Sequence, residues 1–312
     1  MEEPPHVTAP APFALGSSQR LIALLALACV PAWALAFVLA RAGLSWGHPS
    51  ARVVPLLYGA TPAFAALFLS LGLLRERDPG ALGLALRVDR WLAAAWLTAP
   101  LAVLGAASLA WCWPGAEAAT SSADFWEYYR ARVPDAARGA FEREAAASIT
   151  SGSHPAVRFA LAGLVGGVIP GAILKLGTEL AWRGVAFRAL EGARTSARAL
   201  VTAGMEFVWV LPLALLGYFT ADAPALGAAA LLPNVVARAF LLDALRRRTG
   251  TLLAGAVLLG TVEALGPLVA ITTRGAPAWA ASMHGAAGAI VFAAMAALMA
   301  LVPARTAGVA DE

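Results

Sequence analysis

The chain has 312 residues, of which 60% are hydrophobic and only 13% are charged, and its formal net charge is +4. A soluble domain is usually about 45–50% apolar and about 25% charged, so this composition excludes an ordinary soluble protein and predicts several membrane spans. The surplus of arginine is typical of positively charged cytoplasmic loops. No basic and aromatic cluster indicates a nucleic-acid partner, and no cofactor is expected.

The predicted spans follow each other along most of the chain. Residues 1–19 are polar and proline-rich and lack the features of a cleaved signal, so we expect a cytoplasmic tail there and a second one at 304–312. Between them, 20–303 form one transmembrane domain. A spanning helix needs about 20 mostly apolar residues. Eight segments qualify: 20–43, 52–74, 90–113, 156–187, 197–218, 224–245, 251–272 and 279–303. The expected fold is an all-α polytopic bundle in a lipid bilayer.

The segment 156–187 is long enough for one helix or two, with GGVIPG at 166–171 as the candidate break. The basic loops lie at 75–90, 188–198 and 246–250 and in the tail after Arg305. They share one side of the membrane only if 156–187 crosses once. The positive-inside rule therefore predicts one crossing, kinked near Pro170, and both termini in the cytoplasm, with the bacterial inner membrane as the expected location.

The segment Ser122–Ser148 is amphipathic and aromatic at its start. We expect a helix that lies on the outer membrane surface or caps the bundle, and an ordered loop is the alternative. Cys29 and Cys112 both fall in apolar stretches without metal-ligand spacing, so they are expected to be inert core thiols.

Three charged residues recur every four positions around the sequence GTELAWRG: Lys175, Glu179 and Arg183. In a helix they share one face, with Glu179 between two cations. An ionisable group at membrane depth costs a few kcal/mol or more, so it is usually paired and often functional. The pattern indicates either an internal ion-pair ladder or a site, and we predict that Glu179 pairs with Arg183, Lys175 or both.

Further polar residues fall within the predicted spans: Glu206, Asn234, Arg238, Asp243, Glu263 and His284. Glu206 and Glu263 have apolar neighbours, so each is expected to be protonated, paired with a cation (Lys175, Arg183 or Arg238) or in a wet cavity. Arg238 and Asp243 could reach the cytoplasmic interface, and His284 is expected at the outer one. The chain has no HExxH, GxSxG or P-loop motif and no metal motif.

GTELAWRG resembles GEELGWRG, the first motif of the CPBP family of intramembrane proteases, which includes CAAX proteases and bacteriocin-processing enzymes. WVLPLALLGY at 209–218 is similar to WHAPLILLGY of one bacterial branch, and RRRTGTLLAGAVLLGTVEA at 246–264 to LRSGSVWPAALAHGALNA. The similarity extends over nearly the whole chain, and its motif region is about 156–272. The resemblance implies a CAAX-protease-like bundle and an intramembrane endopeptidase as the ancestral activity.

In that family the first Glu of the motif activates water, and two histidines and an asparagine bind the reacting carbonyl. Glu179 and Arg183 are retained here. The departures are Thr178 at the catalytic Glu, Val210 (or Leu211, counted from Phe207) and Leu259 at the histidines, and Glu263 at the asparagine. Valine and leucine donate no hydrogen bond, and threonine is no general base near pH 7. Losing one oxyanion donor alone costs about 10²–10³ in rate, so the inherited mechanism is expected to be absent.

Two functions remain in view. The first is a pseudoprotease that binds a transmembrane or lipid-modified C-terminal sorting segment of a client, or assists an active protease paralogue. The alternative is a glutamate-type endopeptidase with a rebuilt site of Glu179, Glu206 and Glu263, which would hold a divalent metal or act as acid and base. Lys175 and Arg183 argue against the metal. Transport has no specific support, since no transporter repeat is recognisable.

Overall fold

The computed structural model describes residues 16–43, 54–74, 78–131, 133, 138–149, 154–220 and 222–302. Within these ranges, seven helices are long and apolar enough to cross a membrane, so the chain is an integral membrane protein with the predicted all-α fold. They are α1 (Ser17–Arg41), α2 (Val54–Leu67) with the π-helical η2 (Phe68–Leu73), α3 (Arg90–Trp111), the stretch Pro155–Ala189, α9 (Thr195–Leu215), α10 (Pro224–Thr249), and α11 (Leu253–Leu265) with α12 (Pro267–Ile271). The predicted tail 304–312 and most of 1–19 lie outside the described residues.

The stretch Pro155–Ala189 is one continuous helix of 35 residues, which confirms the single-segment prediction. Its parts are α6 (Pro155–Gly166), η4 (Gly167–Gly171), α7 (Ala172–Glu179), η5 (Leu180–Val185) and α8 (Ala186–Ala189). Both η4 and η5 are π-helical, and η4 contains Pro170, whose missing N–H interrupts α-helical bonding where the kink was expected. At about 1.5 Å per residue the stretch is about 52 Å long, well beyond the ~30 Å hydrocarbon core.

The last apolar segment differs from the prediction. The helix α13 is Ala286–Leu301, and its 16 residues are fewer than the predicted 279–303. The preceding chain forms the short strand β2 (Thr273–Arg274), antiparallel to β1 (Glu117–Ala118), and then turns. Gly275 at φ +79° favours such a turn over a helix. The fully buried Asn234 donates to the carbonyl oxygens of Met283 (2.8 Å) and Gly285 (3.3 Å), and thereby holds this non-helical segment against α10.

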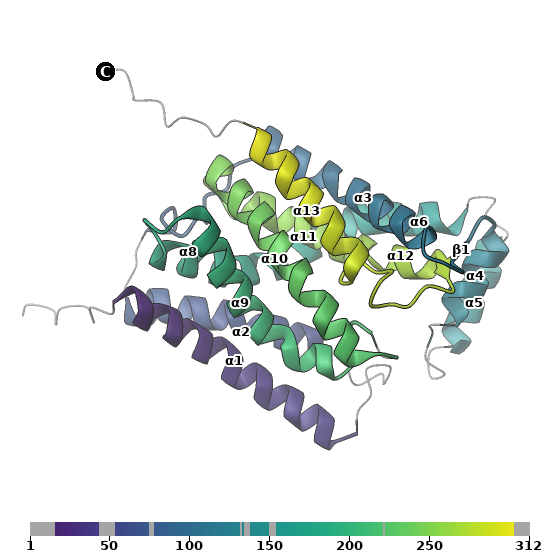
Figure 1. The fold of residues 1–312 in the computed structure, drawn as a ribbon, viewed down its shortest axis with the longest axis horizontal. Helices are drawn as coiled ribbons and strands as arrows, with labels where there is room; N and C mark the ends of the chain where they lie inside the picture. The colour runs from purple at the N-terminus through teal and green to yellow at the C-terminus, as the bar shows by residue number, and fades with distance from the viewer. Residues whose placement is uncertain are drawn as a thin grey trace, which may run out of the picture.

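The amphipathic segment forms two helices instead of one, α4 (Ser122–Arg130) and α5 (Arg138–Ile149). Their aromatic residues Phe125, Trp126 and Phe141 form a separate apolar cluster with Ile271 of α12. In Figure 1, α4 and α5 lie at one end of the bundle, and α8 and the end of α13 lie at the other. The segment therefore covers one end of the bundle, in agreement with the expectation of a helical cap.

The core of the bundle consists of two large apolar clusters. One joins α1 and α2 to α9 and the middle of α10, and the other joins α3 to α10, α11 and α13. Across the first, the Tyr58 hydroxyl donates to the carbonyl of Trp209 (2.5 Å), and the Trp209 indole donates to Thr61 (3.0 Å). Cys29 is buried there as expected, but Cys112 is exposed because it follows the end of α3, which corrects the prediction of two core thiols.

Small residues let the helix Pro155–Ala189 approach α11 closely. Gly163, Gly167 and Gly171 recur every four residues, and each lies where a side chain would meet α11. On α11, a Cβ at Gly260 would in turn lie 2.5 Å from the backbone nitrogen of Ala172. Without a hydrophobic driving force in lipid, such close backbone contact is a main source of helix association.

The glycine contact gives a direct stability prediction. A Cβ at Gly167 would collide with the backbone of Thr261, whereas a Cβ at the adjacent Gly166 meets no atom within 4 Å. Gly167→Ala should therefore cost about 1–3 kcal/mol through overpacking, while Gly166→Ala should be neutral or stabilising. Thermal unfolding of both variants in one detergent measures the difference, and equal melting temperatures would contradict the contact.

Candidate functional site

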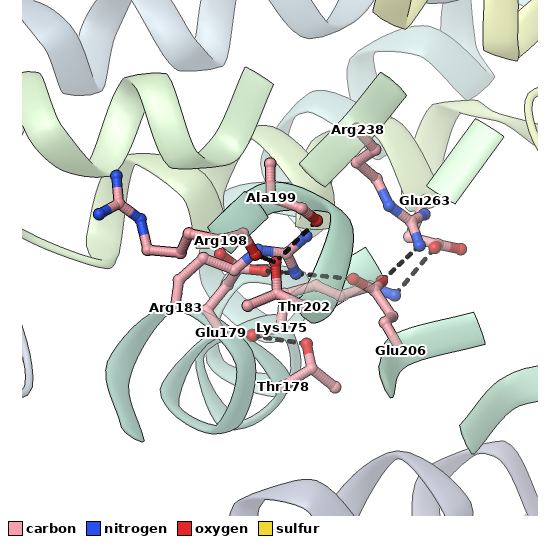
Figure 2. A network of polar contacts seen from close by, with 10 residues as sticks. All are labelled: Lys175, Thr178, Glu179, Arg183, Arg198, Ala199, Thr202, Glu206, Arg238 and Glu263. Carbon is pink, nitrogen blue, oxygen red and sulfur yellow. Dashed lines mark hydrogen bonds and ion pairs between the residues drawn. The ribbon is translucent and has the colours of Figure 1, made fainter. Parts of the chain in front are cut away.

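Four charged residues form a buried group that we call the closed cluster: Glu179, Arg183, Glu206 and Arg238. Arg183 Nη1 donates to Glu179 Oε1 (3.2 Å) and to Glu206 Oε2 (2.7 Å). Arg238 Nη2 donates to the other oxygen of Glu206 (2.5 Å). Figure 2 shows the Glu206 carboxylate with arginine on both sides. These contacts join η5, α9 and α10 across the bundle.

A second group lies next to it, and we call it the open cluster: Lys175, Glu263 and His284. Lys175 Nζ lies 2.8 Å from Glu263 Oε1, and His284 Nε2 lies 3.4 Å from Glu263 Oε2. The three side chains are 28%, 29% and 24% exposed, unlike the closed cluster, whose side chains are buried. The His284 ring contacts Phe219, with centroids 4.6 Å apart. A charged group at membrane depth that stays accessible is a candidate binding site.

The predicted ladder is formed in part. The Glu179–Arg183 pair is confirmed, but Lys175 pairs with Glu263 across the α7–α11 interface. The Glu263 carboxylate sits directly opposite on α11, and an i, i+4 pair within one helix contributes only about 0.2–0.5 kcal/mol. The Lys175 side chain therefore pairs with Glu263 on α11 and not with Glu179 in its own helix.

The two clusters are balanced in formal charge, because Lys175, Arg183 and Arg238 face three carboxylates. Glu179 also lies within electrostatic range of Glu206, Arg238 and Lys175, so the clusters form one network. Donors outnumber acceptors in it. Within the described part of the chain, Nε and Nη2 of Arg183 and Nε of Arg238 are buried without a hydrogen-bond partner. Each carboxylate is accordingly a counter-ion that the arginines and the lysine need.

Three of the positions that differ from the CPBP motifs, Thr178, Val210 and Leu259, form no contact with the charged groups of this network among the hydrogen bonds and ion pairs of the described residues. The Thr178 hydroxyl donates to the carbonyl of Lys175 (2.8 Å), so its proton is used within its own helix. Val210 is buried in the apolar cluster of α1, α2 and α9. Leu259 is buried in the other large cluster, with α3 and α13. None of these three side chains offers a donor or a base to a ligand.

The sequence alternative of a three-carboxylate metal site is not formed. Glu179 and Glu206 share Arg183, but Glu263 belongs to the open cluster. Among the described residues, no group of three or more His, Cys, Asp or Glu side chains is arranged to hold a metal ion. The physical reason is that arginine nitrogens occupy both oxygens of Glu206.

Several polar contacts were missed from the sequence. Arg198 and Arg247 both bind Asp243, with Arg198 Nη2 to Oδ2 at 3.1 Å and Arg247 Nε to Oδ2 at 3.0 Å. Asp243 and Arg238 are buried and paired within the bundle. His284 lies beside Glu263 in the open cluster. Its partner Glu263 is 21 positions away, and no local pattern could have indicated that pair.

A comparison of the chain with protein-family models gives no match, and comparisons with curated proteins and with solved structures give no significant match. The CPBP resemblance therefore rests on the motifs quoted above.

Proposed function

We propose that this membrane protein is a CPBP-like pseudoprotease, which binds a transmembrane or lipid-modified segment of a client and leaves it intact. One observation carries the proposal: both oxygens of Glu206 accept hydrogen bonds from arginines. A general base must accept a proton from water, and a carboxylate between two guanidinium groups holds its negative charge too firmly for that task. Glu179 accepts a single arginine hydrogen bond, from Arg183 Nη1 to Oε1 at 3.2 Å.

The rebuilt endopeptidase remains the second candidate because of Glu263. It is the one partly exposed carboxylate of the three, and His284 lies 3.4 Å from it, so the two form a partly exposed carboxylate–imidazole pair. Lys175 at 2.8 Å from the same carboxylate weakens it as a base, since the ammonium stabilises the ionised form. Because of this contact we rank the rebuilt endopeptidase below the pseudoprotease.

The open cluster supports the binding half of the proposal. Its ammonium, carboxylate and imidazole could exchange partners with a polar or charged group of a client segment, whereas the closed cluster is inaccessible. Binding by exchange needs no base, which agrees with threonine, valine and leucine at the three CPBP catalytic positions. Such a protein could present or retain a sorting segment for an active protease paralogue.

Binding is tested by photocross-linking. A photoreactive phenylalanine analogue in place of Phe219, which contacts His284, should cross-link to a membrane-anchored peptide of full length. The matched control places the analogue at Ile22 on the exposed face of α1. Equal cross-linking at both positions, or cross-linking to a shortened peptide, would contradict the proposal.

We further propose that the protein resides in the bacterial inner membrane with both termini in the cytoplasm. Support comes from the basic loops and from the helical continuity of Pro155–Ala189, which favours one crossing there. Termini on the same side need an even number of crossings, so the proposal takes the shorter apolar helix α13 as an eighth span beside the seven longer ones. Reporter fusions after Arg90, Arg198 and Arg248 are expected to report the cytoplasm, and a fusion after Arg130 the opposite side. A fusion at Arg198 that reports the opposite side would overturn this topology.

A further inference from the structure

Two arginines lie near each other at the C-terminal end of α10, and neither forms an ion pair with a residue that the structure describes. Arg246 lies in the last turn of α10, and Arg87 lies in the loop before α3, within electrostatic range of it. Neither side chain forms an ion pair or hydrogen bond with any described residue, and Nε of Arg246 is buried. Two neighbouring cations repel each other, so an anion bound between Arg87 and Arg246 would stabilise the pair.

The surrounding contacts hold Arg246 and the backbone of the loop that carries Arg87. The Arg246 guanidinium lies over the Phe187 ring (5.6 Å) and against Gly83, where a Cβ would be 2.5 Å from Cζ. Thr251 Oγ1 donates to the carbonyl of Ala85 (2.7 Å), and Leu252 N donates to that of Gly83 (2.8 Å). The loop that carries Arg87 is thus bonded to the α10–α11 corner, and the site is preformed.

The nearby groups do not neutralise this pair. The carboxylate of Asp243, three residues before Arg246, already binds Arg198 and Arg247. Arg248 donates to the carbonyls of Ala244, Met299 and Val302. A helix C-terminus offers only about half a negative charge, which three consecutive arginines exceed.

Two exposed apolar residues identify the source of the anion. Leu86 and Val88 flank Arg87, and each is 81% exposed. This segment lies where α10 ends and α3 begins, at the end of the spans, so its apolar side chains lie at the level where headgroups meet acyl chains. Basic pockets between helices at that level bind anionic headgroups. A soluble phosphate would gain nothing from Leu86 and Val88.

We propose that Arg87 and Arg246 bind the phosphate of an anionic phospholipid, with Leu86 and Val88 in contact with its acyl chains. The phosphate oxygens accept from the two guanidinium groups and supply the missing counter-charge. This site is separate from the open and closed clusters.

The experiment is native mass spectrometry and thermal unfolding of the full-length protein in detergent, with added phosphatidylglycerol, phosphatidylcholine or inorganic phosphate. Phosphatidylglycerol should be retained and should raise the melting temperature, and the other two should not. Arg87→Gln and Arg246→Gln should each weaken phosphatidylglycerol retention about 5-fold or more, since each removes one charged hydrogen-bond donor. Arg194→Gln removes one exposed arginine beside α9 and is the matched control, with less than a twofold effect.

Arg87 is exposed, so Arg87→Gln keeps the test valid even if Arg246→Gln fails to fold. Equal retention by Arg87→Gln and the unmodified protein would overturn the site. Stabilisation by inorganic phosphate equal to that by the lipid would overturn the lipid as its source.

Discussion

Replacing Glu206 by glutamine is expected to lower the free energy of unfolding by about 3–5 kcal/mol, the largest stability change that we predict for a single substitution. The carboxylate accepts from Arg183 at 2.7 Å and from Arg238 at 2.5 Å. Glutamine leaves both guanidinium groups buried beside a neutral amide. Each guanidinium already has at least one buried N–H group without a hydrogen-bond partner. No other described acceptor binds these groups, so the loss of the Glu206 charge is not offset. Denaturant or thermal unfolding in detergent measures the loss.

The matched control is Glu127→Gln, which breaks the exposed pair of Glu127 with Arg274 (2.9 Å). An exposed ion pair contributes little, so this variant should unfold like the original protein. If Glu206→Gln does not fold, the double variant Glu206→Gln with Arg238→Gln removes anion and cation together and should recover part of the yield. Equal stability of Glu206→Gln and Glu127→Gln would contradict the closed cluster.

The fold followed from the sequence where the signal is local. About 20 apolar residues per span and the basic loops predict the long helices, because the hydrocarbon core sets their length and backbone pairing must be internal. The exception is the segment before α13. Residues 279–285 were included in the last predicted span, but they are not helical, and buried Asn234 on α10 donates to the carbonyl oxygens of Met283 and Gly285. Asn234 lies about 50 positions from these carbonyls in the sequence, so no periodic pattern of residues near 279–285 indicates the contact.

The site was predictable only within a helix. The four-residue spacing predicts the Glu179–Arg183 pair, and it also suggested a Lys175 partner that the structure replaces with Glu263. For Glu206 the sequence left three alternatives, a protonated carboxyl, a wet cavity or pairing with one of three cations, and the structure pairs it with two of those cations, Arg183 and Arg238. Partner choice across interfaces depends on helix packing, which one sequence does not specify.

The second large effect concerns catalysis. The purified protein is expected not to hydrolyse membrane-anchored peptides, because Thr178, Val210 and Leu259 provide neither a base nor oxyanion donors. A variant with Thr178→Glu, Val210→His, Leu259→His and Glu263→Asn together restores the CPBP residues and is expected to gain cleavage. Groups of this kind act as a unit, so each single restoration should give almost no activity.

Substitution of Glu263 in the unmodified protein distinguishes its two possible roles. In the pseudoprotease it is a counter-ion of Lys175, so Glu263→Gln should change stability or binding and leave cleavage at zero. In a rebuilt enzyme it is the accessible base beside His284, and the same substitution would abolish cleavage. Glu206→Gln gives the equivalent comparison for the closed cluster, and Glu179→Gln tests whether the second glutamate of the motif acts as the base.

The most direct measurement is therefore cleavage of one membrane-anchored peptide in proteoliposomes, with the unmodified protein, the fourfold restored variant and Glu263→Gln side by side. We expect an intact peptide with the unmodified protein and with Glu263→Gln, and cleavage with the restored variant alone. Robust cleavage by the unmodified protein that Glu263→Gln or Glu206→Gln abolishes would contradict it, because the carboxylates would then be catalytic groups and not counter-ions.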